Sequence, residues 1–401
     1  MSLLEPDRVG EVVDIVRAHA ADRRPLAVQG LGSKAGLGRP VVAEDTLSLR
    51  NLSGIVSYQP AELVLTARSG TPMREIQAAL AEKNQHLAFE PMTAGRLLGN
   101  SNDQGSIGGV LAANLSGPRR PSAGAARDHF LGFGAINGLG EEFKAGGKVV
   151  KNVTGYDLPK LLAGSMGTLA ALTEVTIKVL PAPEKQRTVL VPVPDAATGH
   201  RHLITLLQGA LEIDGAAYLP ARVAARSGID MVRDRGSALA ALRLSGSPGS
   251  VADRCAALRQ AVGTASEELH SMRSRALWAE IRDVATLLPE DGACLWRISV
   301  PPRSGAEIAA ALAGSAGDWL MDWGGGLLWI ARPQASVDDA AQVRAAIGAV
   351  GGHATLMRGP ETLRRAIDVF AREVPTALLK RVKESFDPLH ILNPGRMYRD
   401  L

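Results

Sequence analysis

The sequence has few cysteines and no clustered histidines. Only Cys255 and Cys294 occur in 401 residues, far apart, whereas an iron–sulfur cluster takes about four cysteine ligands. The eight histidines are scattered apart from His200 and His202, and no pair shows H-x-x-x-H spacing. We therefore expect no metal site made by this chain alone, and the scarcity of cysteine suits a reducing compartment.

Long apolar runs are also missing. No window approaches the roughly 18 consecutive apolar residues that identify a membrane-spanning helix. Glu5, Asp7 and Arg8 follow the first methionine so closely that no apolar core of a signal peptide fits before them. We expect a cytoplasmic protein that reaches the inner membrane only through partner subunits.

Aromatic residues make up 4% of the chain, and the basic residues do not gather into a stripe. A nucleic-acid-binding surface needs clustered Lys and Arg. The net charge of +4 comes from arginines spread along the sequence, which predicts solubility and an affinity for small anions or an acidic partner. Nucleic acid is not an expected ligand.

The chain is long for one hydrophobic core, so two domains are expected. Residues 6–20 repeat apolar positions with helical spacing, whereas residues 173–179 alternate between apolar and polar as a strand does. This mixture of helices and strands indicates an α+β fold rather than a regular doubly wound sheet. Pro181 and Pro183 precede the polar residues 184–187, which mark the domain boundary.

Other elements are predicted from local signals. Thr71 and Pro72 are typical of a helix start, Asn137-Gly138 of a hairpin turn, and Asp157 of an N-cap. Further strands are predicted at residues 26–29, 46–49, 62–67, 188–193, 295–300 and 327–331.

The first glycine-rich motif is Gly30–Gly38, directly after a predicted strand. Glycines allow the backbone to turn its N–H groups inward around an anion, and Ser33 and Lys34 add a donor and a positive charge suited to a pyrophosphate. The spacing is G-x-G-x-x-x-G, which is neither the Rossmann fingerprint nor a P-loop. Taken alone, the motif is equally compatible with a plain surface loop.

Two further motifs follow. Gly105–Gly117 combines a helix start with almost no side-chain bulk, which allows either a flat ligand to lie on backbone with free N–H donors, or close helix packing. Lys148–Leu158 and Gly164–Glu174 place two glycine turns around a short helix that leads into the alternating strand.

In this order, the three motifs resemble the FAD-binding domain of the vanillyl-alcohol-oxidase superfamily, also called the PCMH type. The resemblance covers about residues 5–180 and the Asn393-Pro394-Gly395 tail. It implies an FAD-binding domain over residues 1–183, a smaller α+β cap domain over 184–370, and a C-terminal helix and tail, 371–401, that return to the FAD domain.

The resemblance also implies which segments contact the cofactor. The first loop would hold the pyrophosphate, the second motif would line the ribityl chain and isoalloxazine, and the third would meet the adenosine end. The residues expected at the cofactor are Gly30, Leu31, Gly32, Ser33, Lys34, Gly105, Ser106, Ile107, Gly108, Gly109, Ala112, Asn114, Gly117, Gly167, Leu172 and Thr173.

Within the superfamily, the sequence resembles the E subunits of bacterial glycolate oxidases (glycolate dehydrogenases). The segments that carry this likeness are Gly117–Pro121, Gly147–Asp157 and Ile391–Tyr398. The resemblance implies oxidation of glycolate or a similar 2-hydroxy acid to the 2-oxo acid, in a complex with a D-type flavoprotein and an iron–sulfur F-type subunit. A hydride would pass to the flavin and its electrons onward through the partners.

The sequence departs from relatives in three places. Relatives with covalent flavin often carry a histidine in the first loop, where this chain has Ser33, so we expect non-covalent FAD. Met166 stands in place of a glutamate and cannot supply a carboxylate to the adenosine end. Residues 186–401 contain nothing like the H-x-G-D-G-N motif of the catalytic D-type subunits, and Asp322–Gly326 is interpreted as a turn.

Arg119 and Arg120 are the best candidates to bind an anion near the flavin, because a guanidinium grips a carboxylate with two hydrogen bonds. A helix-end or subunit-contact role is the alternative, and His129 is interpreted as structural. Three functions stay open: a flavin-binding subunit of a glycolate oxidase, a self-sufficient FAD oxidoreductase of another hydroxy acid or alcohol, or a flavin-free scaffold.

Overall fold

The computed structural model describes residues 2–98, 105–147, 155–263, 265–287, 293–313, 318–333, 336–371 and 375–401. The chain divides into two compact units. Unit 1 comprises Met1–Ser116, Gly124–Ala182 and Asp368–Leu401, and unit 2 comprises Gly117–Ala123 and Pro183–Ile367. The domains expected from the sequence end at residues 183 and 370, and they did not include a passage of Gly117–Ala123 into unit 2.

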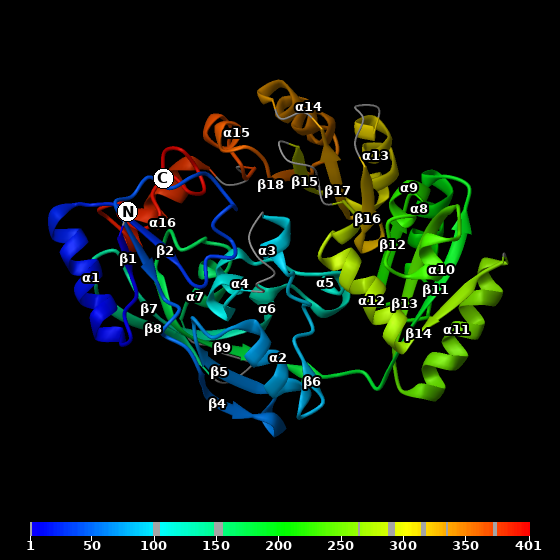
Figure 1. Ribbon diagram of the computed structural model, residues 1–401, viewed down its shortest axis with the longest axis horizontal. Helices are drawn as coiled ribbons and strands as arrows, with labels where there is room; N and C mark the ends of the chain where they lie inside the picture. The colour runs from blue at the N-terminus through cyan, green and yellow to red at the C-terminus, as the bar shows by residue number, and fades with distance from the viewer. Residues whose placement is uncertain are drawn as a thin grey trace. The chain divides into compact units, whose positions relative to one another are not determined.

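Unit 1 contains two principal sheets (Figure 1). The first has the order β1-β3-β2 and is parallel: β1 (Ser2–Leu4), β3 (Asp45–Ser48) and β2 (Leu26–Gln29). The second has the order β4-β5-β9-β7-β8 and is antiparallel: β4 (Ile55–Gln59), β5 (Val64–Arg68), β9 (Ala171–Lys178), β7 (Phe130–Ile136) and β8 (Glu142–Gly146).

The alternating strand is β9, and its pattern explains its place in the sheet. Val175, Ile177 and the following Val179 are fully buried in the main core of unit 1, where they pack with helix α4 (Ile107–Ala113). On the other face, Thr176 shares a hydrogen bond of 3.0 Å with Thr66 on β5. One face of the strand therefore builds the core while the other ties two strands together.

Helix starts were predicted with mixed success. Asp157 caps α7 (Leu158–Leu162) by accepting from the Lys160 N–H, as expected. The prediction for Thr71 was wrong: α2 (Met73–Ala81) begins after Pro72, and the Thr71 hydroxyl donates instead to the Arg68 and Gly54 carbonyls. The Thr71 hydroxyl therefore stabilises the turn after β5 and does not cap α2.

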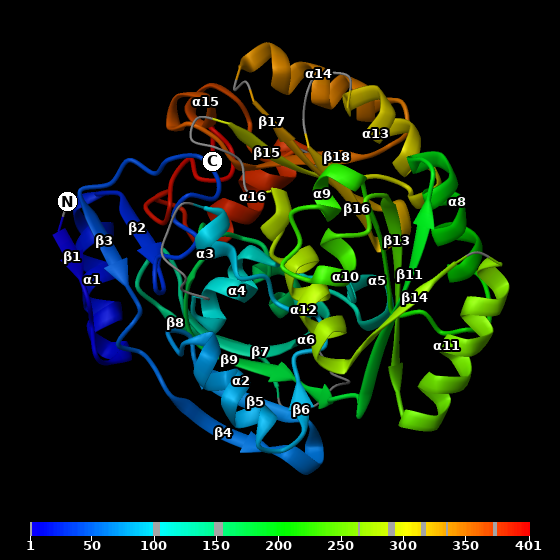
Figure 2. The ribbon, with the colours of Figure 1, turned by 45° about the vertical axis from the view of Figure 1, so that its right-hand side comes forward.

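The C-terminal tail returns to unit 1, as the expected fold requires. Helix α16 (Thr376–Phe386), red in Figures 1 and 2, leads into the tail. In the tail, Leu392 forms a parallel bridge with Leu26 of β2. Lys383 and Asp387 form a buried ion pair of 2.6 Å that also binds backbone groups of the tail. The N-terminal strand β2 and the C-terminal tail are thus hydrogen-bonded to each other within unit 1.

Unit 2 is built on an eight-stranded sheet with the order β14-β11-β13-β12-β16-β17-β15-β18. Its strands are β11 (Lys185–Val193), β12 (Gly215–Leu219), β13 (Ala238–Gly246), β14 (Glu267–His270), β15 (Cys294–Ser299), β16 (Trp319–Asp322), β17 (Leu327–Arg332) and β18 (His353–Arg358). All the strand pairs in this sheet are antiparallel.

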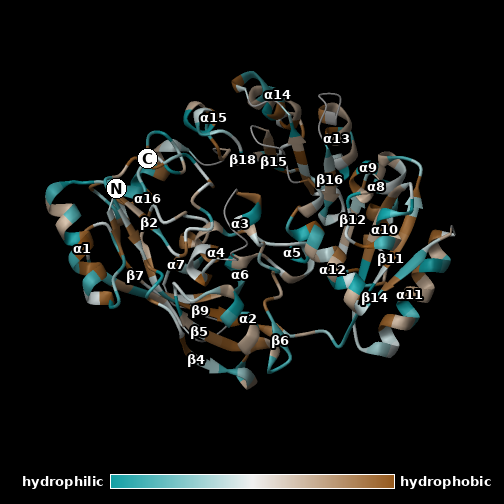
Figure 3. Cartoon of the chain, viewed as in Figure 1, coloured by the Kyte–Doolittle hydropathy of each residue, from teal (hydrophilic) through white to brown (hydrophobic). Residues whose placement is uncertain are grey.

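Helices pack on the sheet of unit 2, among them α8 (Ala196–Leu207), α11 (Pro248–Val262), α12 (Ser271–Arg282) and α14 (Val337–Gly348). Figure 3 shows the strands largely hydrophobic, whereas the helices carry hydrophilic residues on their outer turns. Within the described part of the chain, no helix combines the length and the apolar character that crossing a bilayer would require.

Candidate functional site

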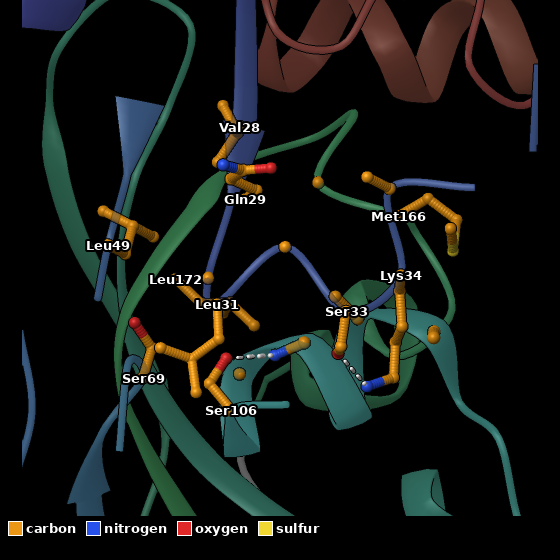
Figure 4. Close-up of a pocket in the computed structure, with 18 of the residues that line it drawn as sticks. Val28, Gln29, Leu31, Ser33, Lys34, Leu49, Ser69, Ser106, Met166 and Leu172 are labelled. Carbon is orange, nitrogen blue, oxygen red and sulfur yellow. Dashed lines mark hydrogen bonds between the residues drawn. The ribbon is translucent and has the colours of Figure 1, made fainter. Parts of the chain in front are cut away.

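A pocket in unit 1 is lined mainly by three segments that are distant in sequence, with single residues from elsewhere in the unit (Figure 4). The space between its walls, including the part open to solvent, amounts to about 680 Å³. The lining residues are Val28, Gln29, Gly30, Leu31, Gly32, Ser33, Lys34, Ala35, Leu49, Ser69, Ser106, Gly108, Gly109, Ala112, Ala113, Ser165, Met166, Gly167, Ala170, Leu172 and Arg396. We call this cavity the glycine pocket.

The first wall is the loop that follows β2. Gly32 has a φ of +78°, which favours glycine, and the Ala35 N–H donates to the Gly32 carbonyl over 3.0 Å. This turn folds Ser33 and Lys34 inward, where both are buried. The Lys34 ammonium donates to the Ser33 hydroxyl over 3.2 Å, so both polar groups lie at the same point of the pocket wall.

The second wall is α4, and the glycine at position 108 is a packing requirement. A Cβ atom on Gly108 would lie 2.8 Å from the Ser69 carbonyl oxygen, and one on Gly30 would collide with the Ser106 hydroxyl. Gly109 is different, because a Cβ there meets nothing closer than the Ser106 hydroxyl at 3.4 Å. Gly108 thus lets the helix approach its neighbours, whereas Gly109 leaves room on the pocket side.

The expectation of free N–H donors at this helix start was wrong. The Ile107 N–H donates to the Thr71 carbonyl and the Gly108 N–H to the Ser69 carbonyl, while the Ser106 hydroxyl accepts from the Gly109 N–H. Buried N–H groups need partners, and the turn after β5 supplies them. Helix α4 therefore contributes shape to the pocket rather than hydrogen-bond donors from its first turn.

The third wall is the turn Ser165–Gly167. Met166 and Gly167 both adopt positive φ, and the Met166 N–H donates to the Ala112 carbonyl over 2.9 Å, which fixes the turn on the end of α4. Asn393 holds the other side of the turn: its amide donates to the Met166 and Val28 carbonyls, and its oxygen accepts from the Val28 N–H. One tail residue therefore links this wall to the first.

The charged side chains that line the pocket are both cations. Lys34 enters from the loop, and Arg396 enters from the tail and donates to the Lys34 carbonyl over 3.0 Å. No carboxylate is among the lining residues that the structure describes. A pocket with cations, no acids and walls of bare backbone fits a flat ligand that carries a pyrophosphate.

Eleven of the sixteen residues expected at the cofactor line this pocket, and they come from all three walls. The other five do not line it, for physical reasons that differ. Ile107 and Thr173 are buried in the interior, Gly105 packs against Ser33, Asn114 caps α4 and accepts from the Arg127 N–H, and Gly117 belongs to unit 2.

Sequence reasoning missed Arg396 and Ser69 as pocket residues. The resemblance implied only that the tail containing Arg396 returns to the FAD domain. Local sequence patterns do not show which tail side chain enters the cavity, because the first wall of the cavity lies more than 350 residues earlier in the sequence. Residues 148–154 of the third motif lie outside the described residues, so their expected contribution is not placed here.

The paired arginines lie in unit 2 and have different environments. Arg119 forms an ion pair with Asp214, which also accepts from Arg243 over 2.9 Å. Burial alone would raise the pKa of the Asp214 carboxyl, but Arg243 and Arg119 outweigh it and hold that pKa below its usual value. Arg120 is exposed and lies over the ring of Trp323.

His129 has the environment of a packed residue. It is buried in unit 1, its ring lies 5.3 Å from the ring of Phe89, and its Nδ1 lies 3.3 Å from the Lys178 carbonyl oxygen. It does not line the glycine pocket. These contacts accord with the structural role expected for it.

Comparison with known proteins assigns the family. Residues 2–146 match the family model described as an FAD binding domain. The chain is 36% identical over 402 residues to the glycolate oxidase subunit GlcE of Escherichia coli, with all of both chains covered. It belongs to the GlcE family. As a member of this family, the chain is an FAD-linked oxidoreductase subunit with an FAD-binding domain.

Two further likenesses extend this result. The glycolate oxidase subunit GlcD of Bacillus subtilis is 27% identical over 190 residues, which cover 47% of this chain and 39% of that one. A crystal structure of p-cresol methylhydroxylase superposes with a TM-score of 0.71 at 13% identity, covering 99% of this chain and 88% of that chain, which shows a shared fold.

Proposed function

We propose that this chain binds FAD non-covalently in the glycine pocket and acts as a subunit of a glycolate-oxidising complex. The observation that carries the proposal is the pocket itself, with three backbone walls, two cations and no described acid, in a chain of the GlcE family. Bound FAD would supply the acceptor for the hydride of a 2-hydroxy acid.

The chain's own residues would have distinct roles in holding FAD. Lys34 and Arg396 would neutralise the pyrophosphate, since buried cations gain most from an anionic partner. Gly109 and Ala112 would leave a smooth wall for a flat ring system. Ser33 lies in the first loop where relatives with covalent flavin often carry histidine, and a serine offers no imidazole nitrogen for such a bond.

The proposed complex contains a D-type flavoprotein and an iron–sulfur F-type subunit. Two observations support partners: the relative that shares the whole sequence is itself described as a subunit, and the described residues contain no group of side chains suited to hold a metal. Electrons from a reduced flavin would therefore leave through other chains. Any contact with a membrane belongs in this proposal to the complex.

The test is an absorbance spectrum of the purified chain, alone and co-expressed with the D- and F-type subunits, before and after glycolate. We expect a flavin spectrum from the chain and bleaching by glycolate only in the complex. Acid precipitation should release all the flavin into the supernatant, which a covalent bond would prevent.

Other outcomes would replace the proposal. Bleaching of the isolated chain by a hydroxy acid would make it a self-sufficient oxidoreductase. A colourless chain that does not take up added FAD would make it a scaffold, and a co-expressed complex that ignores glycolate would remove the substrate assignment.

A further inference from the structure

Two arginines of unit 2 share one tryptophan. The guanidinium carbon of Arg120 lies 4.6 Å from the ring centroid of Trp323, and that of Arg297 lies 5.0 Å from it. Arg120 begins α5 (Arg120–Ala123) in the segment that passes into unit 2, and Arg297 lies on β15. We call Arg120, Arg297 and Trp323 the arginine–tryptophan cluster.

Among the residues that the structure describes, no acid contacts the Arg297 guanidinium. Within the described part of the chain its guanidinium makes no hydrogen bond and no ion pair; its recorded interactions are with the Trp323 ring and, through charge alone, with Arg120 and Asp322. Burial and the like charge of Arg120 lower the pKa of Arg297 to about 10, against a smaller opposing effect of Asp322. The group therefore stays cationic at neutral pH, in an environment that disfavours its charge.

The neighbouring arginine shows what a structural role looks like in this fold. Arg119 directs its guanidinium to the Asp214 carboxylate, which Arg243 also contacts. That cation is matched by an acid inside the same unit. Arg297 contacts no such acid among the described residues, although charged groups in poorly hydrated places are normally paired.

The backbone that presents Trp323 is strained. Trp323, Gly324 and Gly325 have φ values of +54°, +64° and +102°, and a tryptophan rarely adopts this region. The conformation is held by two bonds: the Asp322 carboxylate accepts from the Trp323 N–H over 2.7 Å, and the indole N–H donates to the Gly117 carbonyl over 3.0 Å. Strain that persists because its surroundings fix it is concentrated at functional sites.

We propose that Arg120 and Arg297 bind the carboxylate of the small 2-hydroxy acid, with Trp323 holding the two guanidiniums in place. A carboxylate would supply the anion that Arg297 lacks, and the planar fork of a guanidinium matches its two oxygens. The inference rests on the proposed function for the identity of the acid. It assigns substrate binding to this chain, although the chain has no H-x-G-D-G-N-like motif in residues 186–401.

The test measures glycolate binding to the full-length, FAD-loaded chain by calorimetry, and separately the KM of the co-expressed complex. Arg297→Ala should weaken glycolate binding and raise KM by about 10- to 100-fold, with a smaller change in kcat, because a charge-assisted pair is lost. Arg297→Lys should recover part of the loss, since it keeps the charge without the fork. Arg120→Gln, at an exposed position, should weaken binding without risk to folding.

The matched control is Arg273→Ala, which removes the same charge from an exposed position of α12 in the same unit. It should leave binding and KM unchanged. Ethylene glycol, which lacks the carboxylate, should not bind the wild-type chain, and inorganic phosphate should compete only weakly.

The possible failures can be told apart. A complex that oxidises glycolate while Arg297→Ala and Arg120→Gln leave binding and KM unchanged would overturn this inference and leave the proposed function standing. A wild-type chain that binds no glycolate would also overturn it. A wild-type complex that does not turn over glycolate would overturn the proposed function, whereas glycolate binding that both variants weaken would still support the carboxylate site.

Discussion

The glycine pocket of unit 1 and the arginine–tryptophan cluster of unit 2 are built in opposite ways. The pocket consists largely of backbone and small residues, and its N–H groups at α4 are already bonded within the protein. The cluster consists of three large side chains, and one of them, Arg297, is a cation that no acid of the described residues contacts. The glycine pocket therefore provides space for a ligand, whereas the arginine–tryptophan cluster provides positive charge.

The difference follows from the sizes of the expected ligands. A dinucleotide has a large surface, so its binding depends on how closely backbone can approach, and side-chain bulk is the main obstacle. A two-carbon acid has little surface to bury, so its binding depends on a few strong polar contacts. The same chain can serve both needs because the two regions are formed by different units.

The largest expected effect comes from filling the pocket. Gly109→Leu should abolish FAD retention, because the new side chain extends from the pocket side of α4, where a Cβ meets no backbone atom within 4 Å. Flavin absorbance per mole of purified protein measures the effect.

Gly10→Leu is the matched control, since Gly10 lies on helix α1 (Val9–Asp22) and has no neighbouring atom within 4 Å of the added Cβ. It should retain FAD fully. Undiminished flavin in a folded Gly109→Leu protein would show that α4 does not face the cofactor. It would also contradict the proposal that the glycine pocket binds FAD.

The next effect concerns the buried ion pair that anchors the tail. Lys383→Met leaves the fully buried Asp387 carboxylate without its cation, which should lower the free energy of unfolding by about 3–5 kcal/mol. FAD should also bind more weakly, because the Lys383 ammonium donates to the Thr168 and Leu392 carbonyls beside the pocket turn. Urea denaturation measures stability, and FAD titration measures affinity.

Lys380→Met, at an exposed position of the same helix, should change neither quantity. If Lys383→Met behaved like this control, the tail would not be needed to close the pocket.

A smaller effect is expected at the two arginines of unit 2, Arg119 and Arg243, that contact the Asp214 carboxylate. Asp214→Asn should lower the free energy of unfolding near pH 7 by up to about 3 kcal/mol, because Arg119 and Arg243 lose their carboxylate. The folded-state pKa of Asp214 lies below its ordinary value of 3.8, so its contribution is present above pH 3.8 and is lost as pH falls through the folded-state pKa. The difference between wild type and variant should therefore shrink towards acid.

Denaturation curves at several pH values give this difference directly. Asp230→Asn, which removes an exposed carboxyl of the same unit, should show no comparable loss at neutral pH. If the wild type kept its higher free energy of unfolding in strong acid, Asp214 would stabilise the fold through its packing and not through its charge.

The smallest effect is expected at the cysteines. Burial, the largest cause, raises the pKa of Cys255 to about 11 and that of Cys294 to about 12, so both thiols stay protonated at neutral pH. The double Cys→Ser variant should keep full FAD content, and the folded wild type should resist thiol reagents. Loss of flavin in the variant would reveal a thiol role that neither region explains.

Local patterns predicted the elements on which the pocket is built. The strand at Leu26–Gln29, the glycine loop after it and the alternating strand β9 are encoded within a few residues each, through periodicity and glycine spacing. The resemblance then brought the separate motifs together as one ligand site, and the structure places them around one cavity.

What escaped prediction depends on contacts between distant residues. The N–H groups of α4 are satisfied by the turn after β5, about 40 residues earlier in the sequence, which no pattern in either segment reveals. The stretch Asp322–Gly326 was interpreted as a turn, and it is one. Its proposed role, however, depends on Arg120 and Arg297, which lie over the ring of Trp323. Local sequence predicts that a turn forms, whereas the residues that contact the turn depend on the tertiary fold.

The position of Asn393 has a consequence for biosynthesis. The FAD binding domain recognised by sequence ends at residue 146, yet the cavity is closed by Asn393 and Arg396. If FAD binds in this cavity as proposed, a nascent chain that ends at residue 146 still lacks Asn393 and Arg396. Tight FAD binding would then begin only after the C-terminal tail has left the ribosome. A premature stop before residue 390 should therefore yield an apoprotein even if all three glycine motifs are intact.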